Sequence, residues 1–429
     1  MIKSSNAVKI PRIKDFSYLS IFIWGFVFFI LLMMRDSYSV GINKYIFFGI
    51  ICICALYMKT NHLIYLFCFL FPLYVGLPGN YMTLVLIVRL SIEIRQFRAS
   101  SFILSIVLAV FTFAQNLATG ASGIVPMMFV VGIILILVLF TLKKDLEVLP
   151  MILMYSAGVA ALGFIMLVST LQVYDFADLM SSSFRLGSGN VDYVDEGTMN
   201  VSADPNFYGM FSIASISIAF PFIFQPKTKA IIKVFLSVFL FTQLVICLIG
   251  LSRTFIIVFI AWAFIYMLTQ KNFKSAIFTG IAIIAILIFL VVCMPNVLEA
   301  ALSRFKDSDM ATANGRITLI QDFWKKWSGS IITMLFGVGL YNCNVHCMPL
   351  QFLFGGGLIM FVLIIVLIIS YRSDKPSRKL SDFLPFVATF IMMCTVPAAG
   401  LFNYMFPLIL IGLCMPNIRG QGEMRNIDE

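Results

Sequence analysis

The chain has 429 residues, of which 61% are hydrophobic and 12% are charged, and its formal net charge is +10. A soluble domain carries about 25% charged residues, so this composition excludes an ordinary soluble domain and predicts an integral membrane protein. The positive charge does not indicate nucleic-acid binding, because lysines and arginines beside membrane spans normally set the topology of the chain.

Long apolar stretches follow one another along almost the whole sequence. A spanning helix needs roughly 20 apolar residues, so the predicted fold class is an all-α, polytopic transmembrane protein with about 11 to 14 spans. The first apolar stretch has no small-residue cleavage site, and we expect it to be retained as a helix. The spans are expected near residues 17–34, 42–58, 62–77, 81–97, 100–116, 124–142, 150–171, 205–225, 230–249, 252–270, 274–294, 347–371, 381–396 and 399–416.

The pair of stretches at 62–97 has a second interpretation. Pro72, Pro78 and Gly79 interrupt it, and proline breaks a helix because it lacks a backbone N–H group and clashes with the preceding turn. The pair is therefore expected to form either two spans or a re-entrant hairpin.

Lysine and arginine placement predicts the orientation of the spans. If the N-terminus is cytoplasmic, most of the 30 basic residues fall on cytoplasmic segments, as the positive-inside rule requires. Both termini are then expected to be cytoplasmic. Residues 1–429 are expected to form one integral membrane domain with two long outer loops, at 172–204 and at 295–346, the second with short helices.

Three polar segments are expected to meet on the outer side. One is Asp204-Pro205-Asn206 at the start of a predicted helix, and another is Ser252-Arg253 at the rim of a later helix. Asp or Asn followed by Pro is ordinary N-capping chemistry, which is an alternative to a binding role. The third segment runs from Asn314 to Leu358 and contains Arg316, His346 and a glycine run that is expected to open a long apolar helix.

Several charged and titratable residues could carry chemistry. A neutral imidazole is a natural general base, although His346 could equally be a loop histidine bound to backbone or water. Guanidinium groups bind pyrophosphate, whereas Arg253 and Arg316 could instead extend to lipid head groups. Arg89 and Glu93 are one helical turn apart and can form an ion pair, and charges at membrane depth are also functional candidates.

Cys343, His346 and Cys347 form a cluster in the second loop. Zinc binding and a disulfide between the two cysteines are both conceivable, but a structural zinc site normally has four ligands and no second pair is visible. We therefore expect neither a metal nor a cofactor. The sequence has no Walker A, G-x-S-x-G or H-E-x-x-H pattern, so it does not indicate an ATPase, a serine hydrolase or a zincin.

Taken together, these motifs resemble the O-antigen polymerase and O-antigen ligase superfamily of bacterial inner-membrane glycosyltransferases. The resemblance rests on Asp204-Pro205-Asn206 with Gly209, on Ser252-Arg253-Thr254, on Asn314-Gly315-Arg316 before Trp324, and on Gly337-Val338-Gly339, His346, Leu350-Gln351 and Gly357. The family usually has Asn or Ser after the histidine and an acidic residue two before the last glycine. Here these positions hold Cys347 and Gly355.

The resemblance implies metal-independent glycosyl transfer on the outer, periplasmic face of the bacterial inner membrane. The donor would be a glycan on undecaprenyl pyrophosphate, and the product would be O-antigen or capsular polysaccharide, as in lipopolysaccharide biosynthesis. His346 would be the catalytic base, and Arg253 and Arg316 would hold the pyrophosphate leaving group. The candidate substrate-binding residues are Asp204, Asn206, Arg89, Arg185, Arg304 and Tyr341.

Other functions remain open at this point. The polymerase is preferred to the ligase, which transfers glycan to the lipid A core, because the first outer loop is long and acidic. Membrane lipid is an expected partner, and a chain-length regulator and a flippase are further candidate partners. A flippase or transporter of lipid-linked oligosaccharide is an alternative from another class, and a non-catalytic scaffold is a third.

Overall fold

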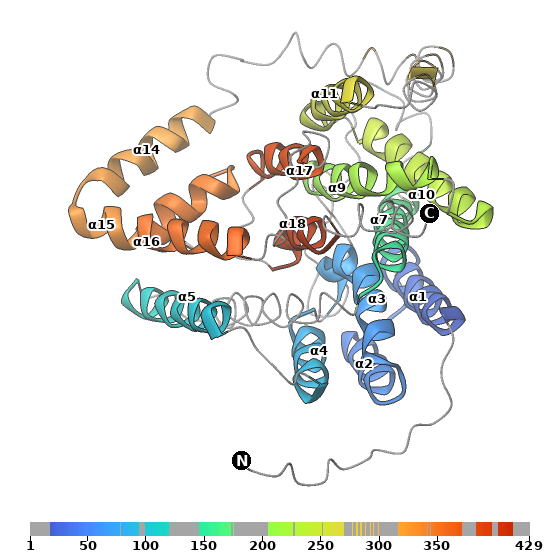
Figure 1. Ribbon diagram of the computed structural model, residues 1–429, viewed down its shortest axis with the longest axis horizontal. Helices are drawn as coiled ribbons and strands as arrows, with labels where there is room; N and C mark the ends of the chain where they lie inside the picture. Colours follow the sequence, from blue (N-terminus) through green and yellow to red (C-terminus); the bar gives the residue numbers. More distant parts are fainter. Residues whose placement is uncertain are drawn as a thin grey trace, which may run out of the picture.

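We describe the protein from a computed structural model (Figure 1). The described residues are 18–77, 79–93, 99–119, 146–172, 175, 205–225, 228–250, 252–269, isolated positions between 277 and 299, 316–340, 342–343, 345–370, 383–396 and 402–414. Every secondary-structure element within these ranges is a helix. The span predicted at 124–142 lies outside the described residues, and so does most of the span predicted at 274–294.

The observed helices follow the predicted spans closely. The stretch predicted at 230–249 is α10 (Ala230–Ile249), and that at 205–225 is α9 (Pro205–Ile223). The other elements before residue 300 are α1 (Tyr18–Leu32), the π-helical turn η1 (Met33–Ser37), α2 (Lys44–Tyr57), α3 (Thr60–Leu70), the 3₁₀ turn η2 (Phe71–Gly76), α4 (Gly79–Glu93), α5 (Ala99–Ala118), α7 (Val148–Leu171) and α11 (Arg253–Thr269). The remaining ones are α14 (Arg316–Ser328), α15 (Ile331–Phe336), α16 (Met348–Ser370), α17 (Leu384–Met393) and α18 (Phe402–Cys414).

Several of these helices could cross a bilayer. The helical stretches Leu19–Ser37, Val148–Leu171, Pro205–Ile223, Ala230–Ile249 and Met348–Val366 are long and apolar enough to do so. Shorter apolar helices of 10–17 residues, such as Arg253–Thr269, accompany them. This architecture is that of a multi-pass helical membrane protein. The total number of spans, the cytoplasmic termini and the outer side of the loops stay predictions.

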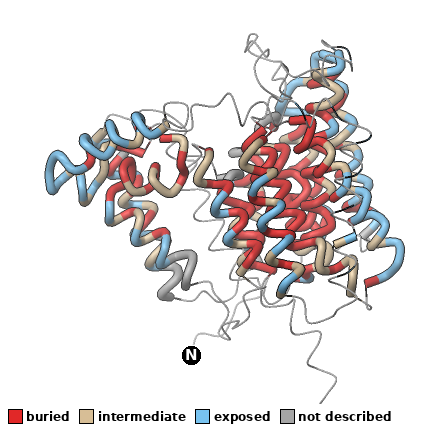
Figure 2. The backbone as a smooth tube through the Cα atoms, turned by 90° about the horizontal axis from the view of Figure 1, so that it is seen from above, coloured by how far each residue is buried: buried red, intermediate tan, exposed pale blue. Residues whose placement is uncertain are grey.

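Helices α7 and α9 form the centre of the main bundle. Of the residues in their most apolar windows, 72% and 78% are buried, respectively, and the buried part of the chain is drawn in red in Figure 2. Helix α7 packs against α3, α9 and α10, while α9 also packs against α11, α17 and α18. Gly158 permits a close approach of α7 to α3, because a Cβ atom there would overlap the carbonyl group of Phe69.

Four helices lie together beside the main bundle (Figure 1). We call α5, α14, α15 and α16 the side group, and α16 packs against each of the other three. The loop before α16 connects the side group with the main bundle, because Leu340 and Met348 are buried in the main hydrophobic core. The loop that contains His346 therefore lies at the junction of the two parts.

The glycine run at 355–357 lies inside α16, where it separates two helical parts. The run therefore precedes only the second part, which corrects the expectation that it opens the whole helix. The helix begins at Met348 and is broken at Gly357, where φ is 78° and ψ is 170°. The backbone of residues 337–339 crosses α16 at the break, and Val338 N donates to Phe354 O over 2.9 Å. A Cβ atom at Gly357 would overlap backbone atoms of Leu335 and Gly337. A glycine is thus required here by the crossing as well as by its backbone conformation.

Gln115 on α5 also forms hydrogen bonds at this crossing. Its Nε2 atom donates to Gly355 O over 2.8 Å and also to Phe336 O. Gly355 O also accepts from Gly339 N over 3.0 Å, and Phe336 is the last residue of α15, so the Gln115 amide ties α5 to both α15 and α16. The side group is therefore held together by hydrogen bonds as well as by apolar packing.

Candidate functional site

The first two polar segments of the sequence meet in the structure. Pro205 is the first residue of α9, and Asn206 follows it with only 8% of its surface exposed. The Ser252 hydroxyl donates to the Asn206 side-chain oxygen over 3.0 Å and accepts a bond from the backbone N–H of Phe255 over 3.4 Å. Ser252 thereby caps α11, of which Arg253 is the first residue. The N-terminal ends of α9 and α11, which carry partial positive charge, thus lie together.

The C-terminal end of α17 packs against these two helix starts. A Cβ atom at Gly209 would lie 2.9 Å from Met392 Cε and 3.1 Å from Phe255 Cβ. The glycine of the Asp-Pro-Asn-x-x-Gly pattern therefore gives α11 and α17 access to the first turns of α9. In this chain, Gly209 allows close packing of the helices.

Just after Met392, the end of α17 lies against the loop that carries His346. Cys394 follows α17 directly and packs against a second hydrophobic cluster, which consists of Trp327, Cys343, Val345, Cys347 and Phe354. His346 lies in this loop and is partly buried. The end of α17 therefore links the starts of α9 and α11 to the histidine loop, which brings together residues of the three predicted polar segments.

Arg316 belongs to the side group. It is the first residue of α14, which packs against α15 and α16. Trp327 Nε1 in the last turn of α14 donates to Met334 O over 3.1 Å. The rings of Trp324 and Trp327 both lie against Phe354 of α16, with centroid distances of 6.0 Å and 5.7 Å. These contacts fix α14 on the same helix that His346 precedes.

Other predicted site residues are not part of this junction or are not described. Arg89 on α4 donates to the backbone oxygen of Ala55 on α2 over 3.1 Å, which attaches it to the main bundle. The side chain of its predicted partner Glu93 lies outside the described residues. The same is true of Asp204, Arg185, Arg304 and Tyr341, whose predicted roles stay predictions.

The cysteines of the histidine loop are free thiols, so the disulfide considered between Cys343 and Cys347 is not formed. Within the described ranges, no three His, Cys, Asp or Glu side chains are grouped as a metal site. Burial raises the pKa of Cys343 to about 11. A hydrogen bond from the Cys394 thiol lowers the pKa of Cys347 to about 7, against the opposing effect of burial.

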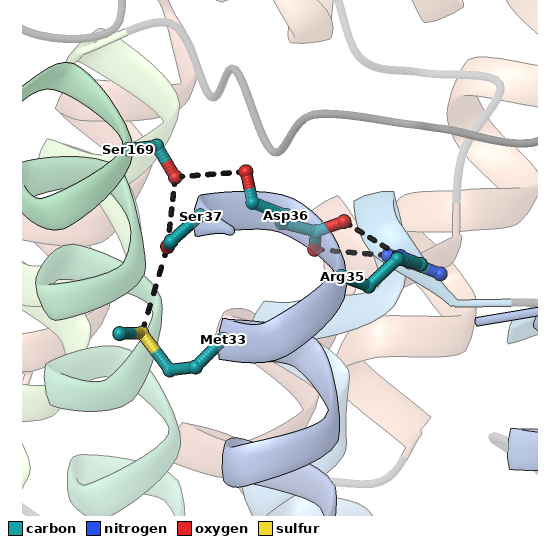
Figure 3. Close-up of polar contacts among 5 residues, drawn as sticks. All are labelled: Met33, Arg35, Asp36, Ser37 and Ser169. Carbon is teal, nitrogen blue, oxygen red and sulfur yellow. Dashed lines mark hydrogen bonds and ion pairs between the residues drawn. The ribbon is translucent and has the colours of Figure 1, made fainter. Parts of the chain in front are cut away.

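A buried ion pair was missed in the sequence. Arg35 and Asp36 lie in η1 and are joined by bonds of 2.6 Å and 2.9 Å between guanidinium and carboxylate (Figure 3). Their side chains are 2% and 0% exposed. Ser169 of α7 hydrogen-bonds to Ser37 over 3.0 Å and to the Asp36 carbonyl over 3.3 Å. Adjacent opposite charges directly after an apolar stretch were the available signal in the sequence.

The end of α17 contacts the starts of α9 and α11 through Met392 and the loop of the partly buried His346 through Cys394. The helix starts can hold an anionic group, and the imidazole can remove a proton. Comparison of the chain with protein-family models, with curated proteins and with solved structures finds no match.

Proposed function

We propose that this protein is a membrane glycosyltransferase that polymerises lipid-pyrophosphate-linked oligosaccharide repeat units. The observation that best supports the proposal is the junction at the end of α17, where Met392 packs against Gly209 and Phe255 and Cys394 packs against the histidine loop. Segments that are far apart in the sequence contact the same end of α17 there. A site that handles both a pyrophosphate and a sugar hydroxyl needs a combination of basic and proton-accepting groups.

In this proposal His346 accepts the proton of the acceptor hydroxyl. Arg253, with the positive ends of α9 and α11, binds the pyrophosphate of the donor and stabilises it as the leaving group. Arg316 contributes a second guanidinium from the side group. Asn206 orients the start of α9 through its bond with Ser252. The donor is a glycan on undecaprenyl pyrophosphate, the acceptor is the next lipid-linked unit, and the reaction needs no metal.

Glycan analysis of cells that lack the protein tests the class of reaction. If it is the polymerase, deletion leaves single repeat units on the lipid A core, and the wild-type gene restores the ladder. If it is the ligase, deletion leaves bare core while polymer accumulates on the carrier lipid. An unchanged ladder would contradict both forms of the proposal.

One observation favours transport of the lipid-linked oligosaccharide as the second candidate. Helix α16 is broken at Gly357, and broken spans are a feature of many transporters, whose substrate sites lie at the interruption. A flippase would carry the unpolymerised unit across the membrane. Its loss would leave single units on the cytoplasmic side, so that enzymes added from the outer side of sealed vesicles could not reach them.

A further inference from the structure

Two cysteines from different parts of the fold share one small hydrophobic cluster. Cys347 directly follows His346 in the loop before α16, and Cys394 directly follows α17. Cys394 packs against the cluster that contains Cys347, Trp327 and Phe354. Both are free thiols, and the Cys394 thiol hydrogen-bonds to the Cys347 sulfur.

A third cysteine in the same cluster provides a comparison. Cys343 is fully buried and lies against Gly355, where a Cβ atom would be 3.0 Å from its own Cβ. Burial favours the neutral thiol at Cys343, whereas the bond from Cys394 favours the thiolate at Cys347. Because the thiolate is the nucleophilic form, we expect Cys347 to be more reactive than Cys343.

We propose that Cys347 and Cys394 are an oxidisable dithiol, which a small peroxide converts into a disulfide between the histidine loop and the end of α17. Only 9% of Cys347 is exposed, which favours an oxidant of the size of hydrogen peroxide. Cys394 is more exposed. The proposal does not depend on the reaction that the protein catalyses.

The chemistry balances in two steps. The Cys347 thiolate attacks one peroxide oxygen, the O–O bond breaks, and the hydroxide that leaves takes up a proton to form water. Cys347 is now a sulfenic acid. The Cys394 sulfur then attacks the Cys347 sulfur, the S–O bond breaks, and a second water leaves with the Cys394 proton. Two thiols are oxidised to one disulfide, and one peroxide is reduced to two waters.

The disulfide would connect the side group to the main bundle. Met392, two residues before Cys394, contacts Gly209 at the start of α9. A bond of about 2.05 Å between the two sulfur atoms would therefore fix the histidine loop relative to the starts of α9 and α11. The oxidised protein would hold His346 and Arg253 in one arrangement by a covalent bond, whereas in the reduced protein these parts are joined by apolar packing and a hydrogen bond.

A split-chain experiment in membranes tests the proposal. A protease site is inserted into the segment 371–382 of the full chain, membranes are treated with hydrogen peroxide or left untreated, thiols are blocked, and the chain is cut. Of the fragments, the C-terminal one contains only Cys394 and Cys414. We expect the oxidised fragments to migrate as one species on a non-reducing gel and to separate after reduction, while untreated fragments separate in both gels.

Four variants identify the bond. Cys347→Ser and Cys394→Ser should each abolish the linked species, whereas Cys343→Ser and Cys414→Ser should preserve it. Cys414 is the essential control because it neighbours Cys68, and that pair would also link the fragments. Mass spectrometry of the oxidised, uncut wild-type chain should show a peptide pair that joins Cys347 to Cys394. This measurement identifies the bond even if a variant fails to accumulate. Separate fragments from oxidised wild type, a Cys343–Cys347 peptide, or linkage that persists in the double variant Cys347→Ser, Cys414→Ser would overturn the proposal.

Discussion

The Ser252 hydroxyl donates a hydrogen bond of 3.0 Å to the side-chain oxygen of Asn206, a residue 46 positions earlier in the chain. This contact joins the starts of α9 and α11. Ser252 is only 1% exposed, and its oxygen also accepts from the N–H of Phe255. One side chain thus caps α11 and fastens it to α9. The arrangement places Arg253 beside the start of α9.

Replacing Ser252 by alanine should lower the free energy of unfolding by about 1–2 kcal/mol, because the variant loses a helix cap and a buried hydrogen bond. Thermal unfolding of the purified protein in detergent measures the change. Thr242→Ala is a matched control, since the Thr242 hydroxyl only bonds back to Val238 O at an exposed position. Equal melting temperatures for both variants would show that the contact does not stabilise the junction.

Replacing Gly357 by alanine should disrupt the side group. The substitution costs about 1–3 kcal/mol for a backbone conformation that is essentially restricted to glycine and roughly 1–3 kcal/mol more for the overlap with Leu335 and Gly337. We expect a lower membrane abundance and a lower melting temperature. Gly49→Ala is the control, because nothing lies within 4 Å of a Cβ atom there. If Gly357→Ala is as stable as Gly49→Ala, the backbone of Leu335 and Gly337 does not closely contact residue 357.

The Arg35–Asp36 pair should be costly to break and cheap to replace. Arg35→Met leaves a buried carboxylate without its partner and should cost about 3–5 kcal/mol. The double variant Arg35→Met, Asp36→Leu removes both charges and should recover most of that loss. Melting temperatures of the two variants measure this difference. A double variant that is no more stable than Arg35→Met would mean that the ion pair itself holds η1 in place.

The thiols of the histidine loop should differ in their dependence on pH. Alkylation requires the thiolate, so the rate at Cys347 should rise with pH through about 7, whereas the rate at Cys343 should rise only near pH 11. Cys394→Ala removes the hydrogen bond and should move the Cys347 midpoint up toward the ordinary thiol value of 9.0. Peptide-resolved labelling with iodoacetamide over a pH series measures both midpoints. A common midpoint for the two cysteines would contradict the assigned contact.

The sequence predicted the helices well because their signal is local. An uninterrupted apolar run long enough to span a bilayer is sufficient evidence for a helix, and the stretch predicted at 230–249 is helical over the same residues. The adjacency of Asn206 and Ser252 could be predicted only in outline, as polar segments on a common side. Their hydrogen bond depends on the packing of α9 against α10 and α11, which hydropathy does not encode.

Other features of the site depend on contacts between distant segments. Gly355-Gly356-Gly357 was interpreted as the opening of a helix because no local signal shows that residues 337–339 cross there. Cys347 was compared only with its sequence neighbour Cys343, whereas its hydrogen-bond partner is Cys394, which directly follows α17. Arg35 lies just beyond the span predicted at 17–34, and the burial of its pair with Asp36 depends on packing of η1 against α7, which the local sequence does not encode.

The substitution His346→Gln tests the central claim most directly. Glutamine keeps hydrogen-bonding capacity but cannot act as a base near neutral pH. In cells that lack the native gene, we expect His346→Gln to give single repeat units on the core at normal membrane abundance, while the other histidine variant, His62→Gln, gives a wild-type ladder. A wild-type ladder from His346→Gln would contradict the proposed role of the junction in glycosyl transfer.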